Sequence, residues 1–152
     1  MASYWIIVGS PGNFAKTKEL GFKVQGMKSR HRRKAEKMAK GDKLIWYITG
    51  SQAFSGYASI TGEYFEDHSP LWGSSKKPEE DYPWRVPIKK ELVLPEAKWI
   101  AVEPLARKMK YVSKWPAPHW RLAFQGNVHE IPKVDFELIR KELEKSAKVK
   151  AA

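Results

Sequence analysis

The chain opens with the stretch YWIIVGSPGNF, residues 4–14, in which a run of bulky apolar side chains stops abruptly. The segment from Tyr4 to Val8 has no polar break, a pattern typical of a strand buried on both faces. Pro11 cannot donate a backbone hydrogen bond to a neighbouring strand, and Gly12 accepts backbone angles that other residues avoid. The sequence therefore predicts a strand over residues 4–9 that ends either in a simple turn or in a site built at the mouth of a sheet.

Strands and short helices follow along the rest of the chain, without a repeat or a low-complexity linker. Apolar and aromatic runs predict strands at residues 22–25, 43–49, 54–65 and 84–94, and a hairpin made of 121–125 and 128–131. Helices are predicted at residues 14–20 with Asn13 as N-cap, at 29–39, after Pro104 and from Asp135 onwards. About six mostly antiparallel strands with small peripheral helices predict a single α+β domain over residues 1–152, with its core at 3–145, built as a twisted β-barrel.

The composition excludes several classes of protein. The 152 residues contain no cysteine, which removes disulfides, thiolate catalysis and Cys-ligated metals. No apolar run is long enough to span a membrane, and the first residues form a strand pattern rather than a signal peptide. We therefore expect a cytoplasmic protein with no membrane partner, and we take it to be a monomer.

The charge is strongly basic and unevenly distributed. The formal net charge is +11, and residues 16–43 hold eleven Lys or Arg against Glu19, Glu36 and Asp42. Residues 63–81 are locally acidic, with six carboxylates against Lys76 and Lys77. Clustered positive charge favours a polyanionic partner, most often nucleic acid, whereas the simpler alternative is a solvated helix face.

Enzyme motifs are absent from the sequence. Its four histidines, His31, His68, His119 and His129, do not have metal-ligand spacing, and there is no nucleophile elbow, Walker loop or dinucleotide fingerprint. Glu66-Asp67-His68 is a local acid–base trio, for which a solvated loop is the ordinary interpretation. We therefore expect no cofactor and no metal.

Aromatic residues add to the case for nucleic acid. Seven tryptophans are too many to belong only to the core of a chain this size, so we expect some to lie at the surface and stack on a ligand. Two alternatives stay open. One is an enzyme acting on nucleic acid or a nucleotide, with His119 or His129 as the acid–base group, and the other is a protein-interaction module.

The order of six motifs resembles the EVE domain family. In chain order they are YWIIVGSPGNF, GFKVQG, MAKGDKLIWYITG, FSGYASITGEYFED, YPWRVPIKKEL and FQGNVHEI, covering about residues 3–145. EVE domains belong to the PUA-like superfamily and are related to the YTH readers of methylated adenine in RNA. The resemblance implies a PUA-like β-barrel with a pocket for a modified or flipped base and a basic rim for the nucleic-acid backbone, with RNA favoured over DNA.

The resemblance also implies roles for particular residues. In YTH domains the first strand ends in a serine-led loop whose later asparagine contacts the base, and Ser10 and Asn13 stand at the matching places, with Pro11 between them. Trp72 lies in the Ser-Pro context of a YTH cage aromatic, and Phe22 or Lys23 occupies the neighbourhood of another. The structural alternatives are a helix cap for Asn13 and a plug packed on the barrel for Trp72.

Further residues complete the predicted site. Trp84 and Arg85 would add a wall and a cation, and Gln25 is a third polar group, although packing for Trp84 and a surface charge for Arg85 are the simpler roles. Asn127 and His129 match the YTH stretch that closes over the base. The residues predicted to contact the backbone are Lys28, Arg30, Arg32 and Arg33.

Overall fold

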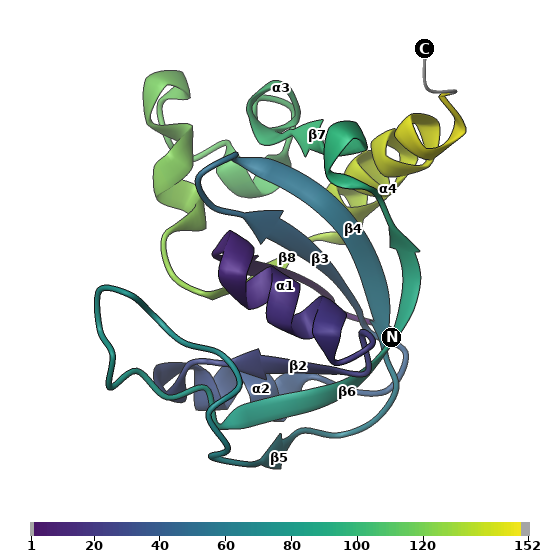
Figure 1. Cartoon of the computed structure of the whole chain (residues 1–152). Helices are drawn as coiled ribbons and strands as arrows, with labels where there is room; N and C mark the ends of the chain where they lie inside the picture. Colours follow the sequence, from purple (N-terminus) through teal and green to yellow (C-terminus); the bar gives the residue numbers. More distant parts are fainter. Residues whose placement is uncertain (1, 150–152) are drawn as a thin grey trace.

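The computed structural model describes residues 2–149. Its centre is a strongly curled sheet in the order β2-β6-β4-β3-β1-β8, a half-barrel whose two outer strands are β2 and β8 (Figure 1). The strands are β1 Tyr4–Gly9, β2 Val24–Met27, β3 Lys43–Ile48, β4 Ala53–Ile60, β5 Phe65–Glu66, β6 Trp84–Val93, β7 Ile100–Ala101 and β8 Val128–Ile131. The two-residue strands β5 and β7 add to β6 and β4. The predicted α+β fold of about six mostly antiparallel strands with small helices is confirmed, and the predicted twisted barrel is a half-barrel.

The opening strand β1 is the middle of the fold. It runs parallel to β3, with Ile6 opposite Ile45, and antiparallel to β8. Its side chains alternate between two separate cores: Ile6 packs in one, and Trp5 and Ile7 in the other. A strand covered on both faces has no place for a polar side chain, which explains the unbroken apolar run.

Helices cover both faces of the sheet. The α-helices are α1 Pro11–Glu19, α2 Arg32–Lys37, α3 Val102–Ala106 and α4 Lys133–Lys148, and the 3₁₀ helices are η1 Ser29–His31, η2 Glu96–Lys98, η3 Lys110–Val112 and η4 Ala117–Phe124. Helix α1 lies within the curl of the sheet (Figure 1), where the Phe14 ring packs 5.6 Å from that of Trp46. Across residues 2–149, every helix is too short or too polar to cross a membrane.

The predicted hairpin at residues 121–125 and 128–131 is wrong. Residues 117–124 form η4, and β8 pairs with β1 instead. Trp120, Ala123 and Phe124 are buried at i, i+3 and i+4, which is a helical spacing, and Pro116 and Pro118 favour a turn at its start.

The bounds of four other predicted elements differ from those in the structure. Helix α1 begins at Pro11 rather than Phe14, because Ser10 and not Asn13 is its N-cap; the Ser10 Oγ accepts the Asn13 N–H at 3.1 Å. Helix α4 begins at Lys133, and the buried Asp135 carboxylate accepts the N–H groups of Lys110 and Tyr111 in η3. The predicted 29–39 helix divides into η1 and α2, and the 54–65 strand ends at Ile60.

The predicted surface tryptophans are at most partly exposed. Trp99 and Trp115 are half-buried, and the other five tryptophans are buried. The half-barrel has two cores, and each has room for several indole rings.

Candidate nucleic-acid interface

A narrow pocket lies where β1 ends, beneath α1. We call it the base pocket; it encloses about 300 Å³, of which only about 20 Å³ has room for the centre of a water molecule. Its walls come from β1, α1, β2, β3 and the β5–β6 loop, residues 67–83. They are formed by Ile7, Gly9, Asn13, Phe14, Thr17, Gln25, Gly26, Trp46, Tyr47, Ile48, Trp72, Tyr82 and Asn127. Among the described residues, none that lines it carries a charge.

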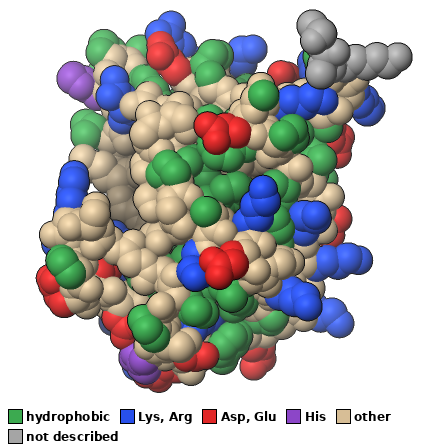
Figure 2. All heavy atoms as spheres, viewed as in Figure 1, with side chains coloured by type: hydrophobic (Ala, Val, Ile, Leu, Met, Phe, Trp, Pro, Cys, Tyr) green, Lys and Arg blue, Asp and Glu red, His purple; other side chains and the backbone are tan. Residues whose placement is uncertain are grey.

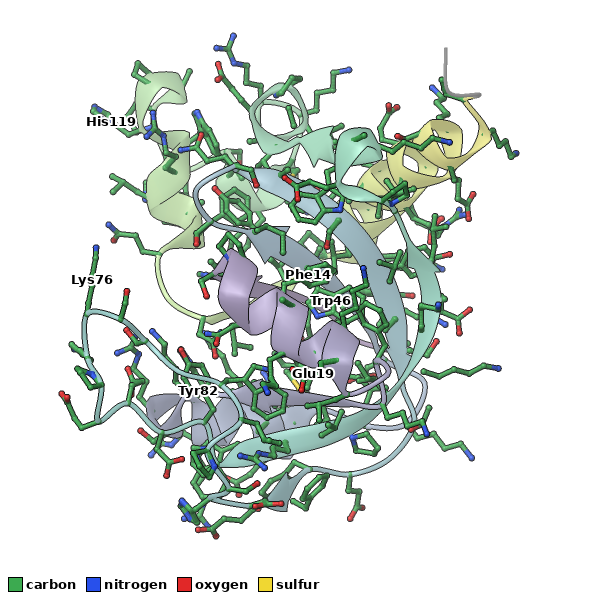
Figure 3. The ribbon with its side chains drawn as sticks, viewed as in Figure 1. Phe14, Glu19, Trp46, Lys76, Tyr82 and His119 are labelled. Atoms are coloured by element: carbon green, nitrogen blue, oxygen red, sulfur yellow. The ribbon has the colours of Figure 1, made fainter. Side chains whose placement is uncertain are left out.

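A wider depression, which we call the basic cleft, continues outward from this pocket. It encloses about 1250 Å³, open solvent included, and shares Gly9, Asn13, Tyr82 and Asn127 with the base pocket. Lys28, Arg30 and Lys76 give the basic cleft its charge. Figure 3 shows Lys76 projecting from the tip of the β5–β6 loop. Figure 2 shows the surface hollowed between that loop and η4, the helix above it in this view.

Trp72 is a buried wall of the base pocket. Its side chain is 5 % exposed, and its Nε1–H donates to the Thr17 Oγ1 at 2.9 Å. The ring lies directly on Gly26, where a Cβ would come within 2.3 Å of the ring carbon Cε3. The structural alternative for Trp72 is therefore correct, because the ring is a plug packed on the barrel. It also lines the base pocket, and stacking on a base stays a prediction.

Arg85 anchors the β5–β6 loop and does not face the pocket. Its guanidinium is 2 % exposed and donates to the Ser69 Oγ at 2.7 Å, to the Ser69 carbonyl and to the Tyr82 carbonyl. It also lies 3.3 Å from the Asp67 carboxylate and over the Trp72 ring. The predicted role as a free cation for a ligand, and the alternative of a surface charge, are both corrected. Its donors are used in holding the loop that carries Trp72.

Asn13 fastens the same loop to α1. Its Nδ2 donates to the Gly73 carbonyl at 2.9 Å and to the Tyr82 hydroxyl at 3.3 Å, and its Oδ1 accepts the Gly73 N–H at 2.9 Å. This two-point pairing with a peptide group is the kind that an asparagine makes with a base edge. Asn13 lines both the base pocket and the basic cleft, Ser10 lines the cleft, and Pro11 lines neither.

Gln25 forms the polar floor of the pocket. Its Oε1 accepts the indole N–H of Trp46 at 2.8 Å, and its Nε2 donates to the Gly26 carbonyl at 2.9 Å. Because both ends of the amide are engaged, its orientation is set before any ligand enters. The Thr17 Oγ1, which accepts the indole N–H of Trp72, lies 3.4 Å from the Gln25 Oε1.

Asn127 bridges the two outer strands of the half-barrel. Its Nδ2 donates to the Val8 carbonyl at 2.8 Å, and its Oδ1 accepts the Lys28 N–H at 3.0 Å. It thereby holds the start of β8 to the ends of β1 and β2. This places Asn127 at the mouth of the base pocket, as predicted from the sequence, with its amide committed to the backbone.

Besides Ser10, Pro11 and Arg85, four predicted site residues lie outside the base pocket. Phe22 packs on Phe14 and Trp46 in the core, and the neighbouring Lys23 is exposed elsewhere. Trp84 donates its indole N–H to the Ser29 carbonyl at 2.7 Å, beneath Arg32. His129 lies in the other core, because its ring nitrogens pair with the Tyr111 hydroxyl and the Gly126 carbonyl.

The predicted backbone contacts divide into two groups. Lys28 and Arg30 line the basic cleft, but Arg32 and Arg33 are exposed on α2, outside it. Sequence reasoning missed Lys76, because a lysine in an acidic stretch gives no local charge signal. It also missed Thr17, Trp46, Tyr47 and Tyr82, which look like ordinary core residues or turn residues in the sequence.

Two histidines at the edges of the site have pKa values shifted in opposite directions. Burial, together with the charges of Lys34 and Arg30, lowers the pKa of His31 to about 4, and its Nε2 accepts the Asn127 N–H at 3.4 Å. The exposed His68 lies between the carboxylates of Glu66 and Asp81, which raise its pKa. His68 of the predicted acid–base trio therefore forms ion pairs with Glu66 and Asp81, which hold the base of the β5–β6 loop.

The His31 shift predicts a loss of stability in mild acid. The unfolded chain binds a proton on this histidine near pH 6.5 and the folded chain near 4, so the free energy of unfolding should fall as the pH drops from about 6.5 to 4. His31→Gln, which keeps an acceptor for the Asn127 N–H, should flatten this fall. Urea unfolding at a series of pH values measures it.

His68→Gln is the matched control, because the pKa of His68 is raised. Its contribution is complete below about pH 6.5 and is lost as the pH rises through its folded-state pKa, so this variant should not flatten the acid limb. Identical acid limbs for wild type and His31→Gln would show that His31 does not carry the effect.

Comparison with known proteins identifies the class and the family of this chain. The curled half-barrel with its small helices is the fold of solved YTH domains. The EVE domain model matches residues 3–142, and the chain belongs to the EVE domain family. A UPF0310 protein of Pyrococcus horikoshii is 26% identical over 149 residues, covering 91% of this chain and 97% of that protein.

Solved YTH domains share the fold. The Mmi1 YTH domain superposes with a TM-score of 0.66 at 14% identity, covering 97% of this chain and 92% of that one. A complex of the Mmi1 YTH domain with RNA gives a TM-score of 0.62 at 15% identity, covering 95% of this chain and 83% of that one.

Proposed function

We propose that this domain is a nucleic-acid reader that holds one base in the base pocket while the backbone lies in the basic cleft. One observation carries the proposal: the pocket is lined by uncharged residues, yet it opens directly into a cleft with three cations. A nucleotide has the same division, because its base is neutral and flat and its phosphate is anionic.

The chemistry of the pocket suits a base taken out of its stack. Such a base needs aromatic faces and hydrogen bonds to its edge, and stacking contributes about 1–3 kcal/mol per base. Trp72, Trp46 and Tyr82 supply aromatic surface. Asn13, Thr17 and Gln25 supply donors and acceptors on three sides of it.

The pocket is too narrow for a base ring as it stands, so its loop wall has to move outward during binding. The β5–β6 loop is the wall that is held by side chains rather than by sheet pairing, through Asn13, Arg85 and His68. Binding of a modified base, and of RNA in preference to DNA, is part of the proposal, and the likeness to a YTH domain in complex with RNA supports RNA as the partner.

The alternative of an enzyme acting on nucleic acid draws less support from the site. His129 lies outside the base pocket, and both of its ring nitrogens have partners. His119 is exposed on η4 (Figure 3), away from the residues that line the pocket.

Salt-dependent binding of single-stranded oligonucleotides tests the proposal. Each neutralised phosphate contributes roughly −0.7 to the log–log salt slope, so the three cations of the cleft predict a slope near about −2. Arg30→Ala/Lys76→Ala should weaken binding of all sequences alike and bring the slope about 1.4 closer to zero. Fluorescence anisotropy with matched plain and modified-base RNA and DNA measures both effects.

Arg32→Ala/Arg33→Ala is the matched control, because it removes two neighbouring charges that lie outside the cleft. This variant should bind like the wild type. A slope near zero for the wild-type protein would rule out the proposed function, and equal losses in the two double variants would show that the backbone does not follow the cleft.

A further inference from the structure

A second basic surface lies on the other side of the basic cleft. Residues 104–129 contain five Lys or Arg and no Asp or Glu. They form most of α3, together with η3 and η4, and Phe124 and Gly126 at the end of this segment line the cleft opposite the β5–β6 loop. In Figure 3, His119 on η4 and Lys76 on the loop mark the two sides. We call Lys114, Trp115 and Arg121 the η4 surface.

Both cations of the η4 surface are free of carboxylates. Lys114 and Arg121 are exposed, and within residues 2–149 neither makes a salt bridge. Their near neighbours are indole rings instead. The Lys114 Nζ lies 4.9 Å from the centre of the Trp115 ring, and the Arg121 guanidinium 5.8 Å from that of Trp120. Trp120 is buried and Trp115 is half-buried, so only Trp115 offers part of a ring face to a ligand. Cations beside such an aromatic face are typical of surfaces that track single-stranded nucleic acid.

Arg121 connects this surface to the basic cleft through η4. Its guanidinium lies over the Trp120 ring, whose centre is 6.3 Å from that of the Phe124 ring. Phe124 lines the basic cleft, and its ring packs 5.1 Å from that of Tyr47, which lines the base pocket. Arg121 therefore lies one turn of η4 before a residue of the cleft wall.

The opposite side of the cleft carries charges of both signs. Lys76 lines the cleft from the β5–β6 loop, but the stretch 63–81 also holds six carboxylates, of which Glu80 lies 3.7 Å from the Nζ of Lys28. The acid-free segment 104–129 is therefore the side with the larger excess of positive charge for a phosphate backbone.

We propose that single-stranded nucleic acid extends from the basic cleft over the η4 surface, with phosphates at Arg121 and Lys114 and a flanking base on the exposed part of Trp115. This proposal rests on the proposed function and adds a second contact region to it. It predicts a site longer than the pocket nucleotide and its neighbours, within the span of about 4–16 nucleotides found for single-strand binders.

Binding as a function of oligonucleotide length tests the proposal. Single-stranded RNAs of about three and about ten nucleotides would carry the same preferred base, and anisotropy would be measured across a salt series. Lys114→Ala/Arg121→Ala should bind the longer RNA roughly tenfold more weakly near 0.1 M salt and bring its slope about 1.4 closer to zero. Its binding of the short RNA should be unchanged.

Lys89→Ala/Lys141→Ala is the control, because it removes the same net charge from exposed positions on β6 and α4. An equal loss in this control, or a wild-type affinity that does not increase with length, would overturn the second contact region and leave the proposed function standing. If the wild-type protein bound neither RNA, the proposed function itself would fail.

Discussion

Trp72→Ala is expected to lower the free energy of unfolding by about 3–5 kcal/mol and to weaken base binding by about 1–3 kcal/mol in the fraction that stays folded. The stability loss follows from burial, because the indole fills the space above Gly26 and bonds Thr17. The binding loss follows from the removal of one aromatic wall, about 1–3 kcal/mol for a stacked base. Urea unfolding and anisotropy with a modified-base oligonucleotide measure the two effects.

A milder pair of variants separates the two roles of this tryptophan. Trp72→Phe keeps an aromatic face but loses the hydrogen bond to Thr17, at a net cost of about 0.5–1.5 kcal/mol in addition to the lost ring area. Trp5→Phe loses a comparable bond, from its Nε1 to the Asp42 Oδ2 at 3.1 Å, in the core outside the pocket. Both should destabilise, but only Trp72→Phe should weaken binding of the modified base.

If Trp72→Phe and Trp5→Phe bound as the wild type does, the base would not lie against Trp72. A Gly26→Ala variant then gives an independent check, since a Cβ at this position would have to displace the Trp72 ring. Loss of binding in Gly26→Ala, with the fold intact, would show that the position of Trp72 matters even where its chemistry does not.

The opening stretch could be predicted well because its physics is local. Five consecutive apolar side chains before a Ser-Pro-Gly turn define a buried strand and its end, whatever the rest of the chain does. The predicted start of the following helix was one turn too late. Proline is favoured at the first helical position, so the helix begins at Pro11 and Ser10 caps it. Asn13 was left free to face the loop and the pocket.

The burial of Trp72 could not be predicted, because its cause is distant in sequence. The surrounding loop is polar, and the space that the ring occupies exists because Gly26, 46 positions earlier, has no side chain. Arg85 was misjudged for a similar reason. Its partners Ser69 and Asp67 lie in a loop whose path no local pattern defines, so the sequence could not show that its guanidinium is already engaged.

The cations that line the basic cleft could be predicted from the sequence only in part. The basic run around Arg30 pointed to the correct side of the molecule, but Arg32 and Arg33 follow the turn of α2 out of the cleft, whereas Lys76 reaches it from an acidic loop. A cluster of charge in sequence therefore located the cleft to within one helix. The composition of its walls depends on the three-dimensional path of the β5–β6 loop.

Asn127→Ala is expected to lower the free energy of unfolding by about 2–5 kcal/mol, because it leaves the Val8 carbonyl and the Lys28 N–H without their partners, at about 1–3 kcal/mol each. It should also weaken nucleic-acid binding, since Lys28 is held at the cleft through this bond. Asn13→Ala is the control: its amide makes three bonds, two of them to the exposed Gly73 of the β5–β6 loop, so its cost should stay near about 1 kcal/mol.

The Asn127→Asp variant tests the bond that the Asn127 Nδ2 donates to the Val8 carbonyl. A carboxylate still accepts the Lys28 N–H, but it opposes the Val8 carbonyl where the amide donated, so the folded state should favour the protonated acid and raise its pKa above about 3.9. Asn127→Asp should therefore be well below the wild type in stability near pH 7 and approach it as the pH falls through that raised pKa, because the protonated acid can donate to Val8 again. Urea unfolding of both proteins at matched pH values measures the gap. A gap that stays constant from neutral to acid pH would mean that the Val8 bond does not hold the half-barrel closed, and that Asn127 acts only by filling space at the mouth of the pocket.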